Sequence, residues 1–170
     1  MSELDIIRAA GKLKRVKRQG WLDAGVKDAE SVADHCYRTA LIVAFCAEGA
    51  DTGPRKGKRG GRLDVLKAVR MALIHDIAEA EVGDLTPRSG VPQAEKARRE
   101  EEAVRRLGDR RVLELWREFD EGKSPEARVV READVQERTI QATEYSREFP
   151  QLDMSSFLEK RKASTRRRST

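Results

Sequence analysis

The sequence predicts an all-α fold, a single bundle of about five or six helices. Apolar residues recur with the period of a helix along most of the chain, and no segment alternates as a half-buried strand does. Charged residues make up 38% of the chain, which fits helices with long solvated faces. The length of 170 residues suits one domain with its own core, and because aromatic residues make up only 5%, that core must be mainly aliphatic.

The N-terminal half contains two predicted helices, at residues 3–13 and 32–48. Glycines interrupt the stretch between them, so we expect residues 14–30 to be irregular. Ser31 is the predicted N-cap of the second helix, whose apolar face is wide enough for burial. A basic, glycine-rich segment at residues 49–61 then reads as a loop.

The C-terminal half predicts four more helices. They cover residues 63–80, 93–107, 111–121 and 125–149. Pro125 suits the first turn of the last one, because its missing N–H and fixed φ are tolerated there. We assign residues 1–150 to the helical domain and 151–170 to a C-terminal extension, whose basic tail from residue 163 is predicted to be disordered.

The charge balance carries little information about a partner. Lys and Arg number 35 against 30 Asp and Glu, and much of the excess lies at residues 55–62 and 166–168, which read as loop and tail. We therefore do not expect nucleic acid as the main partner. No apolar run is long enough to span a bilayer, and the N-terminus does not resemble a signal peptide, so we expect a cytoplasmic protein.

Both cysteines fall on the second predicted helix. Cys36 and Cys46 are ten residues apart, or about 15 Å along a helix, which is far beyond disulfide reach. We expect both to be reduced and buried.

The two histidines indicate a metal site. His75 is followed directly by Asp76 within an apolar run, and His35 lies beside Asp34 on another predicted helix. Asp134 lies near the apolar face of the last helix, where a charge is costly unless it is paired or bound to metal. We predict that His35, His75, Asp76 and Asp134 form one site from three helices. Two nitrogen and two carboxylate ligands suit one divalent transition ion such as Mn²⁺, Co²⁺, Fe²⁺, Ni²⁺ or Zn²⁺.

Each part of this site also has an ordinary structural interpretation. A lone His-Asp pair on a helix is commonly solvated or hydrogen-bonded, and His35 would then be a surface residue near a helix start. Asp134 would form a surface ion pair with Arg131 or Arg138. Glu79, Glu81 and Asp84 would be a solvated acidic surface. The combined spacing favours the metal site over these alternatives.

The motifs resemble those of a known family. The order His, His-Asp, Asp is similar to that of the HD-domain metal-dependent phosphohydrolases. Within roughly residues 10–150, five segments resemble the 5′-deoxynucleotidase branch of that family: Arg15-Val-Lys-Arg18-Gln-Gly-Trp21, Glu30-Ser-Val-Ala-Asp-His35, His75-Asp-Ile-Ala-Glu79, Val82-Gly-Asp84-Leu-Thr-Pro87 and the charged run from Glu95 to Glu102.

The resemblance implies hydrolysis of deoxyribonucleoside 5′-monophosphates to deoxynucleoside and phosphate, with a divalent metal. Glu79 would transfer a proton and Asp84 would position the water or the leaving oxygen. Arg18 would bind the phosphate, and Trp21 would pack on the sugar or base or else serve as a core anchor. The resemblance also implies a homodimer, to which Trp116 and Phe119 would contribute if they are not part of the core.

Three other functions remain open at this point. The first is an HD-domain phosphohydrolase acting on another phosphomonoester, a triphosphate or a cyclic nucleotide. The second is a basic helical protein that binds nucleic acid. The third is a partner-binding bundle with a degenerate site.

Overall fold

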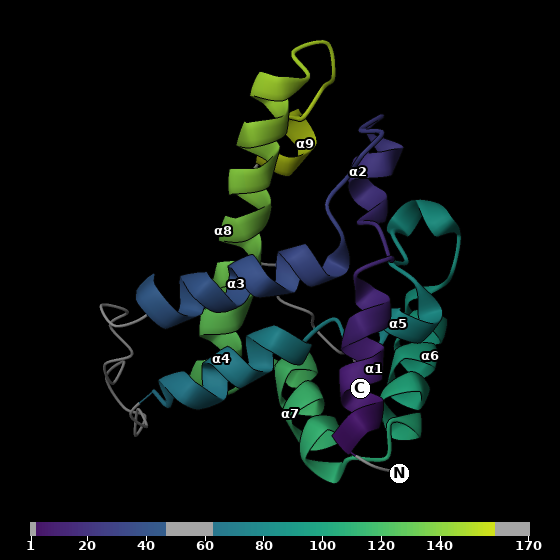
Figure 1. Cartoon of the computed structure of the whole chain (residues 1–170), viewed down its shortest axis with the longest axis vertical. Coiled ribbons are helices and arrows are strands. Elements are labelled where there is room, and N and C mark those ends of the chain that lie inside the picture. Colours follow the sequence, from purple (N-terminus) through teal and green to yellow (C-terminus); the bar gives the residue numbers. More distant parts are fainter. Residues whose placement is uncertain (1–2, 47–62, 159–170) are drawn as a thin grey trace, which may run out of the picture.

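Six helices of ten residues or more carry the fold in the part of the chain that the structure describes, residues 3–46 and 63–158 (Figure 1). The structure is a computed structural model. The six helices are α1 (Glu3–Leu13), α3 (Val32–Cys46), α4 (Val65–Ile74), α6 (Gln93–Arg106), α7 (Arg110–Glu121) and α8 (Pro125–Glu148). Shorter elements are α2 (Gln19–Asp23), α5 (Glu79–Val82), the 3₁₀ turn η2 (Pro87–Ser89) and α9 (Ser155–Leu158). None of the described residues forms a strand, so the predicted all-α bundle is confirmed.

The long helix α8 is the axis of the fold. α3 and α4 pack against each other and both lie across α8 (Figure 1). Ser124 caps α8 by accepting a hydrogen bond from the Ala127 amide at 3.1 Å, and Pro125 occupies the first turn, as predicted. The core between these three helices consists mainly of small and aliphatic side chains, including Val43, Met71 and Val130.

A second core lies below this crossing, where α1, α5, α6 and α7 pack together (Figure 1). Leu13, Ile77, Val104 and Trp116 are buried in it. Trp116 is only 6% exposed, so it belongs to the core of the chain.

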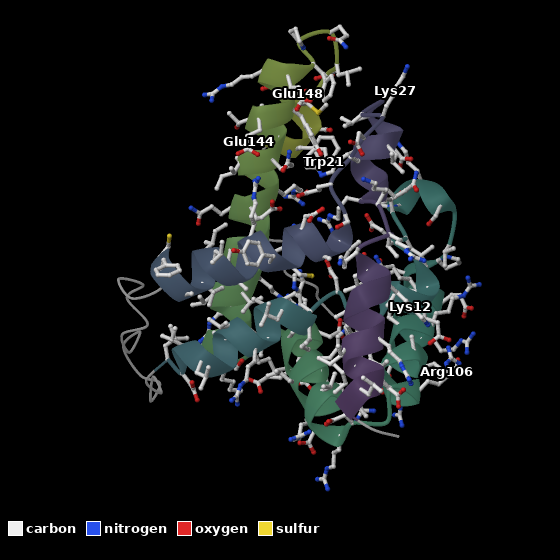
Figure 2. All side chains as sticks on the ribbon, viewed as in Figure 1. Lys12, Trp21, Lys27, Arg106, Glu144 and Glu148 are labelled. Carbon is white, nitrogen blue, oxygen red and sulfur yellow. The ribbon has the colours of Figure 1, made fainter. Side chains whose placement is uncertain are left out.

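A third, smaller core closes the other end of α8. Trp21 of α2 packs there against Tyr145, and Phe157 of α9 stacks on its indole with a ring-centroid distance of 4.1 Å. Figure 2 shows Trp21 on the side of α8 that faces α2. Residues 151–158 thus contribute to the folded body, while the domain boundary near residue 150 stays a prediction.

The predicted helix over residues 63–80 is wrong in one respect, because it is broken in the middle. α4 ends at Ile74 and α5 begins at Glu79. Between them the chain tightens, since the Ile77 amide bonds the Ile74 carbonyl and the Glu79 amide bonds the Asp76 carbonyl, each at 3.0 Å and each only three residues back. An apolar period alone does not reveal such a tightening, which re-aims the side chains of residues 75–79.

Three other predictions concern the stretch before α3, the cysteines, and the basic loop and tail. The stretch expected to be irregular at residues 14–30 contains the short helix α2. Cys36 is buried, but Cys46 is exposed near the end of α3, so the burial predicted for Cys46 is wrong; both thiols are free. The predicted basic loop at 49–61 and the tail from residue 163 lie outside the described residues. Among the described helices, none combines the length and apolar character needed to cross a membrane.

Candidate metal centre and adjoining pocket

His35 is held in the first turn of α3 by a reciprocal cap. The Ser31 hydroxyl accepts a hydrogen bond from the Asp34 amide at 3.2 Å, and the Asp34 carboxylate accepts one from the Ser31 amide at 2.9 Å. This confirms Ser31 as the N-cap. The cap satisfies amides that the helix start would leave without partners, and it fixes the turn that carries the fully buried His35 imidazole.

His75 and Asp76 lie in the tight turn between α4 and α5. The Nδ1 of His75 donates to the Ala72 carbonyl at 2.7 Å, one turn back. Since Nδ1 then carries the proton of the neutral ring, the lone pair of Nε2 points the other way.

The predicted ligands converge at this point. The Nε2 of His75 lies 3.3 Å from an Asp76 carboxylate oxygen, and the Nε2 of His35 lies 3.4 Å from Asp134 and 3.8 Å from Asp76. His35, His75 and Asp134 offer ligand atoms that all lie within 4.8 Å of one another. Both Nε2 atoms are buried and lack a hydrogen-bond partner within residues 3–46 and 63–158, so the residues present fit a bound metal ion.

The electrostatics of the cluster also favour a cation. Burial opposes the imidazolium form of His75, but the neighbouring Asp76 carboxylate raises its pKa well above the usual value. Burial would raise the pKa of Asp76, yet His75 and Arg18 outweigh it and lower that pKa strongly. Such a site holds positive charge in the form of protons or of a divalent ion.

Arg18 is placed beside the cluster by a short backbone pairing. Lys17 and Ser31 form an isolated antiparallel bridge, in which the Arg18 amide bonds the Glu30 carbonyl at 3.0 Å. This pairing ties the segment before α2 to the start of α3. The Arg18 guanidinium consequently reaches the Asp76 carboxylate at 3.3 Å. Burial alone would lower the pKa of Arg18, but the surrounding carboxylates, Asp76 foremost, raise it.

Glu79 is a buried carboxyl next to the cluster. Its side chain shares a cavity of about 140 Å³ with His75 and Asp76, and none of the described residues forms a hydrogen bond with its Oε2 atom. Burial raises the pKa of Glu79 well above its usual value, and the charges of Asp76 and Asp84 raise it further. A protonated carboxyl beside a metal site has the character of a general acid.

Asp84 joins the cluster to α2. It follows Gly83, whose positive φ of 75° ends α5 in a conformation that suits glycine. The Asp84 carboxylate accepts a hydrogen bond from the Gln19 amide at 2.7 Å. Asp84 therefore caps the start of α2, which otherwise has no side-chain cap.

A pocket of about 770 Å³ opens beside Arg18 and Asp84. Trp21, Arg138 and Phe157 are among its lining residues. Trp21 is only 2% exposed and donates from its indole N–H to Glu30 at 2.9 Å, so in this structure it forms part of the wall. Direct packing of Trp21 on a ligand stays a prediction.

Comparisons with known proteins identify the family of the chain. The sequence profile of a family described as "HD domain" matches residues 10–170. The 5′-deoxynucleotidase HDDC2 of Mus musculus is 38% identical over 149 residues, which are 84% of this chain and 69% of the relative. The protein of that name from Dictyostelium discoideum is 34% identical over 157 residues, 88% of this chain and 80% of the relative.

The chain belongs to the HD-domain family. Its fold is similar to that of a conserved hypothetical protein from Pyrococcus furiosus, with a TM-score of 0.78 and 36% identity over 91% of this chain and 85% of the other. The PH0347 protein of Pyrococcus horikoshii gives a TM-score of 0.75 and 34% identity over 91% of this chain and 84% of the other. Within the HD-domain family, the chain groups with the 5′-deoxynucleotidases.

The structure of this HD domain also contains site residues that the sequence motifs did not predict. Glu137 accepts a hydrogen bond from the Nδ1 of His35 at 2.5 Å, and Arg38 forms an ion pair with the other Glu137 oxygen at 3.1 Å. Arg138 lines the pocket, and its buried Nε has no hydrogen-bond partner among the described residues. Their spacing in the sequence could have indicated them, because Glu137 and Arg138 lie three and four positions after Asp134 and therefore share its helix face.

Proposed function

We propose that this chain is a divalent-metal-dependent phosphomonoesterase that hydrolyses deoxyribonucleoside 5′-monophosphates to deoxynucleoside and phosphate. One observation carries the proposal: two buried imidazole Nε2 atoms, which have no hydrogen-bond partner in the part of the chain that the structure describes, face the carboxylates of Asp76 and Asp134, directly beside Arg18. The 5′-deoxynucleotidase names of its relatives support the same reaction.

His35, His75, Asp76 and Asp134 would hold the ion. Their nitrogen and carboxylate donors suit a divalent transition ion, with Mn²⁺, Co²⁺, Fe²⁺, Ni²⁺ and Zn²⁺ as the candidates. Such an ion, when bound, supplies Lewis-acid chemistry, because it lowers the pKa of a water molecule and polarises a phosphoryl group.

The residues around the cluster divide the remaining work. Arg18 lies among carboxylates and has the guanidinium donors that match two phosphate oxygens. As water adds to phosphorus and the bond to the 5′-oxygen breaks, Glu79 gives its proton to that oxygen, which leaves as the hydroxyl of the deoxynucleoside. Asp84 holds α2, and with it Arg18, at the edge of the pocket.

The pocket supports a nucleotide-sized substrate. Its volume of about 770 Å³ lies within the usual range for small-molecule sites. Arg18 and Asp84 lie on its lining together with the aromatic residues Trp21 and Phe157. This arrangement suits a phosphate at the metal end and a nucleoside against the aromatic wall.

The decisive assay is phosphate release from a panel of nucleotides with added Mn²⁺ or Co²⁺. We expect deoxyribonucleoside monophosphates to be preferred over the matching ribonucleotides, deoxyribonucleoside triphosphates and cyclic nucleotides. A preference for triphosphates or cyclic nucleotides would assign the chain to another HD-domain activity. No release from any of them would contradict the proposal.

Asp76→Ala tests the metal ligands. We expect this variant to lose bound metal and phosphatase activity while it keeps its helical circular dichroism, because Asp76 lies in a turn rather than inside a helix. Asp28→Ala is the control, since the Asp28 side chain is 96% exposed. Full activity with unchanged metal content in Asp76→Ala would remove Asp76 from the ligand set.

We also infer a cytoplasmic homodimer. The structure supports an interface on α3, where Tyr37, Leu41 and Phe45 are exposed at four-residue spacing and Phe45 is 79% exposed. Trp116 and Phe119 are accounted for within the chain, since Trp116 is buried and Phe119 packs against the His75 ring. Sedimentation of the wild type and of Phe45→Ser measures the state; a monomeric wild type contradicts the inference.

A further inference from the structure

We infer that the buried carboxylate of Glu137, in an ion pair with the partly exposed Arg38, positions His35 for metal binding, which makes Glu137 a positioning residue of the metal centre. The inference rests on the metal-dependent function proposed above. It concerns two residues that lie behind the imidazole rather than in the substrate pocket.

The first step is the contact between Glu137 and His35. Glu137 is fully buried on α8, three residues after Asp134, and one of its oxygens accepts the hydrogen bond from His35 Nδ1 at 2.5 Å. Because Nδ1 carries the proton, the Nε2 lone pair of His35 faces Asp76 and Asp134. One helix therefore supplies both a predicted ligand and the group that orients another.

The second step is the charge of Glu137. A buried carboxylate is costly unless a partner compensates it. The Nε of Arg38 lies 3.1 Å from the second Glu137 oxygen, and Arg38 is one turn beyond His35 on α3. Its NH1 also donates to Gln141 at 3.1 Å and to Glu144 at 2.7 Å. Arg38 is thus held by α8 side chains and places its positive charge beside the Glu137 carboxylate. Glu144, labelled in Figure 2, marks the outer end of this chain of contacts.

The third step is the contrast between the two imidazoles. His75 donates its Nδ1 proton to a neutral backbone carbonyl, that of Ala72. His35 instead donates its Nδ1 proton to a carboxylate, which makes its Nε2 more basic than the Nε2 of His75 and therefore a stronger metal ligand. The Glu137 carboxylate therefore orients only His35. His75, whose partner is a backbone carbonyl, serves as the comparison within the same site.

A second cation behind His35 is the competing explanation. Glu30, His35 and Glu137 also offer atoms that lie within 4.8 Å of one another. Positive charge and N–H donors already lie beside these carboxyl groups, however, because the Trp21 indole donates to Glu30 at 2.9 Å and the Arg38 guanidinium forms an ion pair with Glu137. The geometry therefore favours orientation of the imidazole over a second ion.

The test is Co²⁺ binding to Glu137→Gln and Arg38→Met, followed by visible absorption in the absence of substrate. We expect each variant to bind Co²⁺ about 10- to 100-fold more weakly than the wild type, with an altered Co²⁺ spectrum. Arg38→Lys retains the charge and should recover most of the affinity. Glu132→Gln makes the same chemical change at an exposed position of α8, and Arg147→Met at another; both should bind as the wild type does.

Nitrogen NMR of the histidines gives a readout that general destabilisation does not produce. In the metal-free wild type, at a pH high enough for both rings to be neutral, we expect the His35 proton on Nδ1, and in Glu137→Gln a loss of that preference with His75 unchanged. Wild-type affinity and tautomer in both Glu137→Gln and Arg38→Met would overturn the inference. The inference would also be overturned if the wild type bound two Co²⁺ ions per chain and Glu137→Gln lost one of them. A wild type that binds no Co²⁺ would overturn it as well.

Measurements of Co²⁺ binding and of nucleotide hydrolysis distinguish the positioning role of Glu137 from the proposed phosphomonoesterase function. If wild type binds Co²⁺ and Glu137→Gln weakens it, the positioning role stands even where no nucleotide is hydrolysed. If deoxynucleotides are hydrolysed but both variants bind Co²⁺ normally, the positioning role alone fails.

Discussion

At the residue scale, Glu79 shows how burial among other carboxylates keeps an acidic side chain protonated. It is 5% exposed, and burial raises its pKa first, with Asp76 and Asp84 adding to the shift. The metal-free folded chain thus keeps a proton that the unfolded chain releases near the ordinary value of 4.5. Since the folded pKa is the higher one, this contribution to stability is full below pH 4.5 and is lost as the pH rises toward the folded pKa.

Glu79→Gln should therefore flatten the pH dependence of stability. Melting in EDTA should give a variant whose Tm exceeds that of the wild type increasingly from pH 5 to pH 8, because the amide stays neutral. Turnover should fall strongly because the proton donor is gone. Glu81→Gln, two residues away and exposed, is the control. Parallel Tm curves for Glu79→Gln and the wild type would argue against a raised pKa.

Arg138 offers a second prediction at this scale. Its buried Nε has no hydrogen-bond partner among the residues that the structure describes, and the residue lines the pocket, so we expect its guanidinium to bind a substrate there. Arg138→Met should raise KM for deoxyribonucleoside monophosphates severalfold and leave Co²⁺ affinity unchanged. Arg147→Met, on the exposed side of the same helix, should leave both as in the wild type. An unchanged KM for Arg138→Met would place the substrate elsewhere.

At the scale of elements, the site depends on how short segments meet long helices. Two of the predicted ligands lie in the tight turn between α4 and α5, and Asp84 follows directly after α5 and caps α2. Buried side chains such as Trp21 of α2 and Ile77 of the turn anchor these short elements. Specific hydrogen bonds also fix their positions, and single substitutions can remove those bonds.

Substitutions of Asp84 can distinguish a role in capping α2 from a role in catalysis. Asp84→Ala should lower stability by about 1 kcal/mol, the usual cost of a lost helix cap, and should lower kcat/KM because α2 no longer holds Arg18 in place. Asp84→Asn keeps an oxygen that can accept from the Gln19 amide, so it should recover the Tm. If Asn also recovers full kcat/KM, Asp84 acts only as the cap; thermal melts and steady-state kinetics measure both.

The same scale shows what could be predicted from the sequence. Helices such as α6 and α8 were predicted within one residue at each end, because Pro125 and the apolar period define them. The break after Ile74 was not predicted, since the apolar pattern continues through it and the tightening depends on tertiary contacts of residues 75–78. Glu137 was not predicted either, because a glutamate on a charged helix reads as solvated until its helix neighbours are known.

At the scale of the whole molecule, α9 contributes part of the wall of the pocket beside Arg18. Phe157 of α9 stacks on Trp21 of α2 and lines the pocket together with Ser156. The two aromatic residues are far apart in sequence, so the wall forms only when α9 packs back on α8.

Phe157→Ala should consequently affect both stability and binding. We expect a loss of about 1–3 kcal/mol, since a half-buried aromatic contact is removed, and a raised KM for deoxynucleotides. The neighbouring Leu158 is 42% exposed, so Leu158→Ala is the matched control and should change neither quantity. Urea unfolding and substrate kinetics measure the two effects, and equal behaviour of the two variants would contradict the role of Phe157.

The spread of the ligands along the chain has a consequence for lifetime. His35 and Asp134 are separated by about a hundred residues, and an ion held by both would act as a removable cross-link that closes this long loop. The unfolded chain, once its ion is gone, regains the entropy of an open loop. The supply of metal would then govern how long each molecule survives as well as how fast it works.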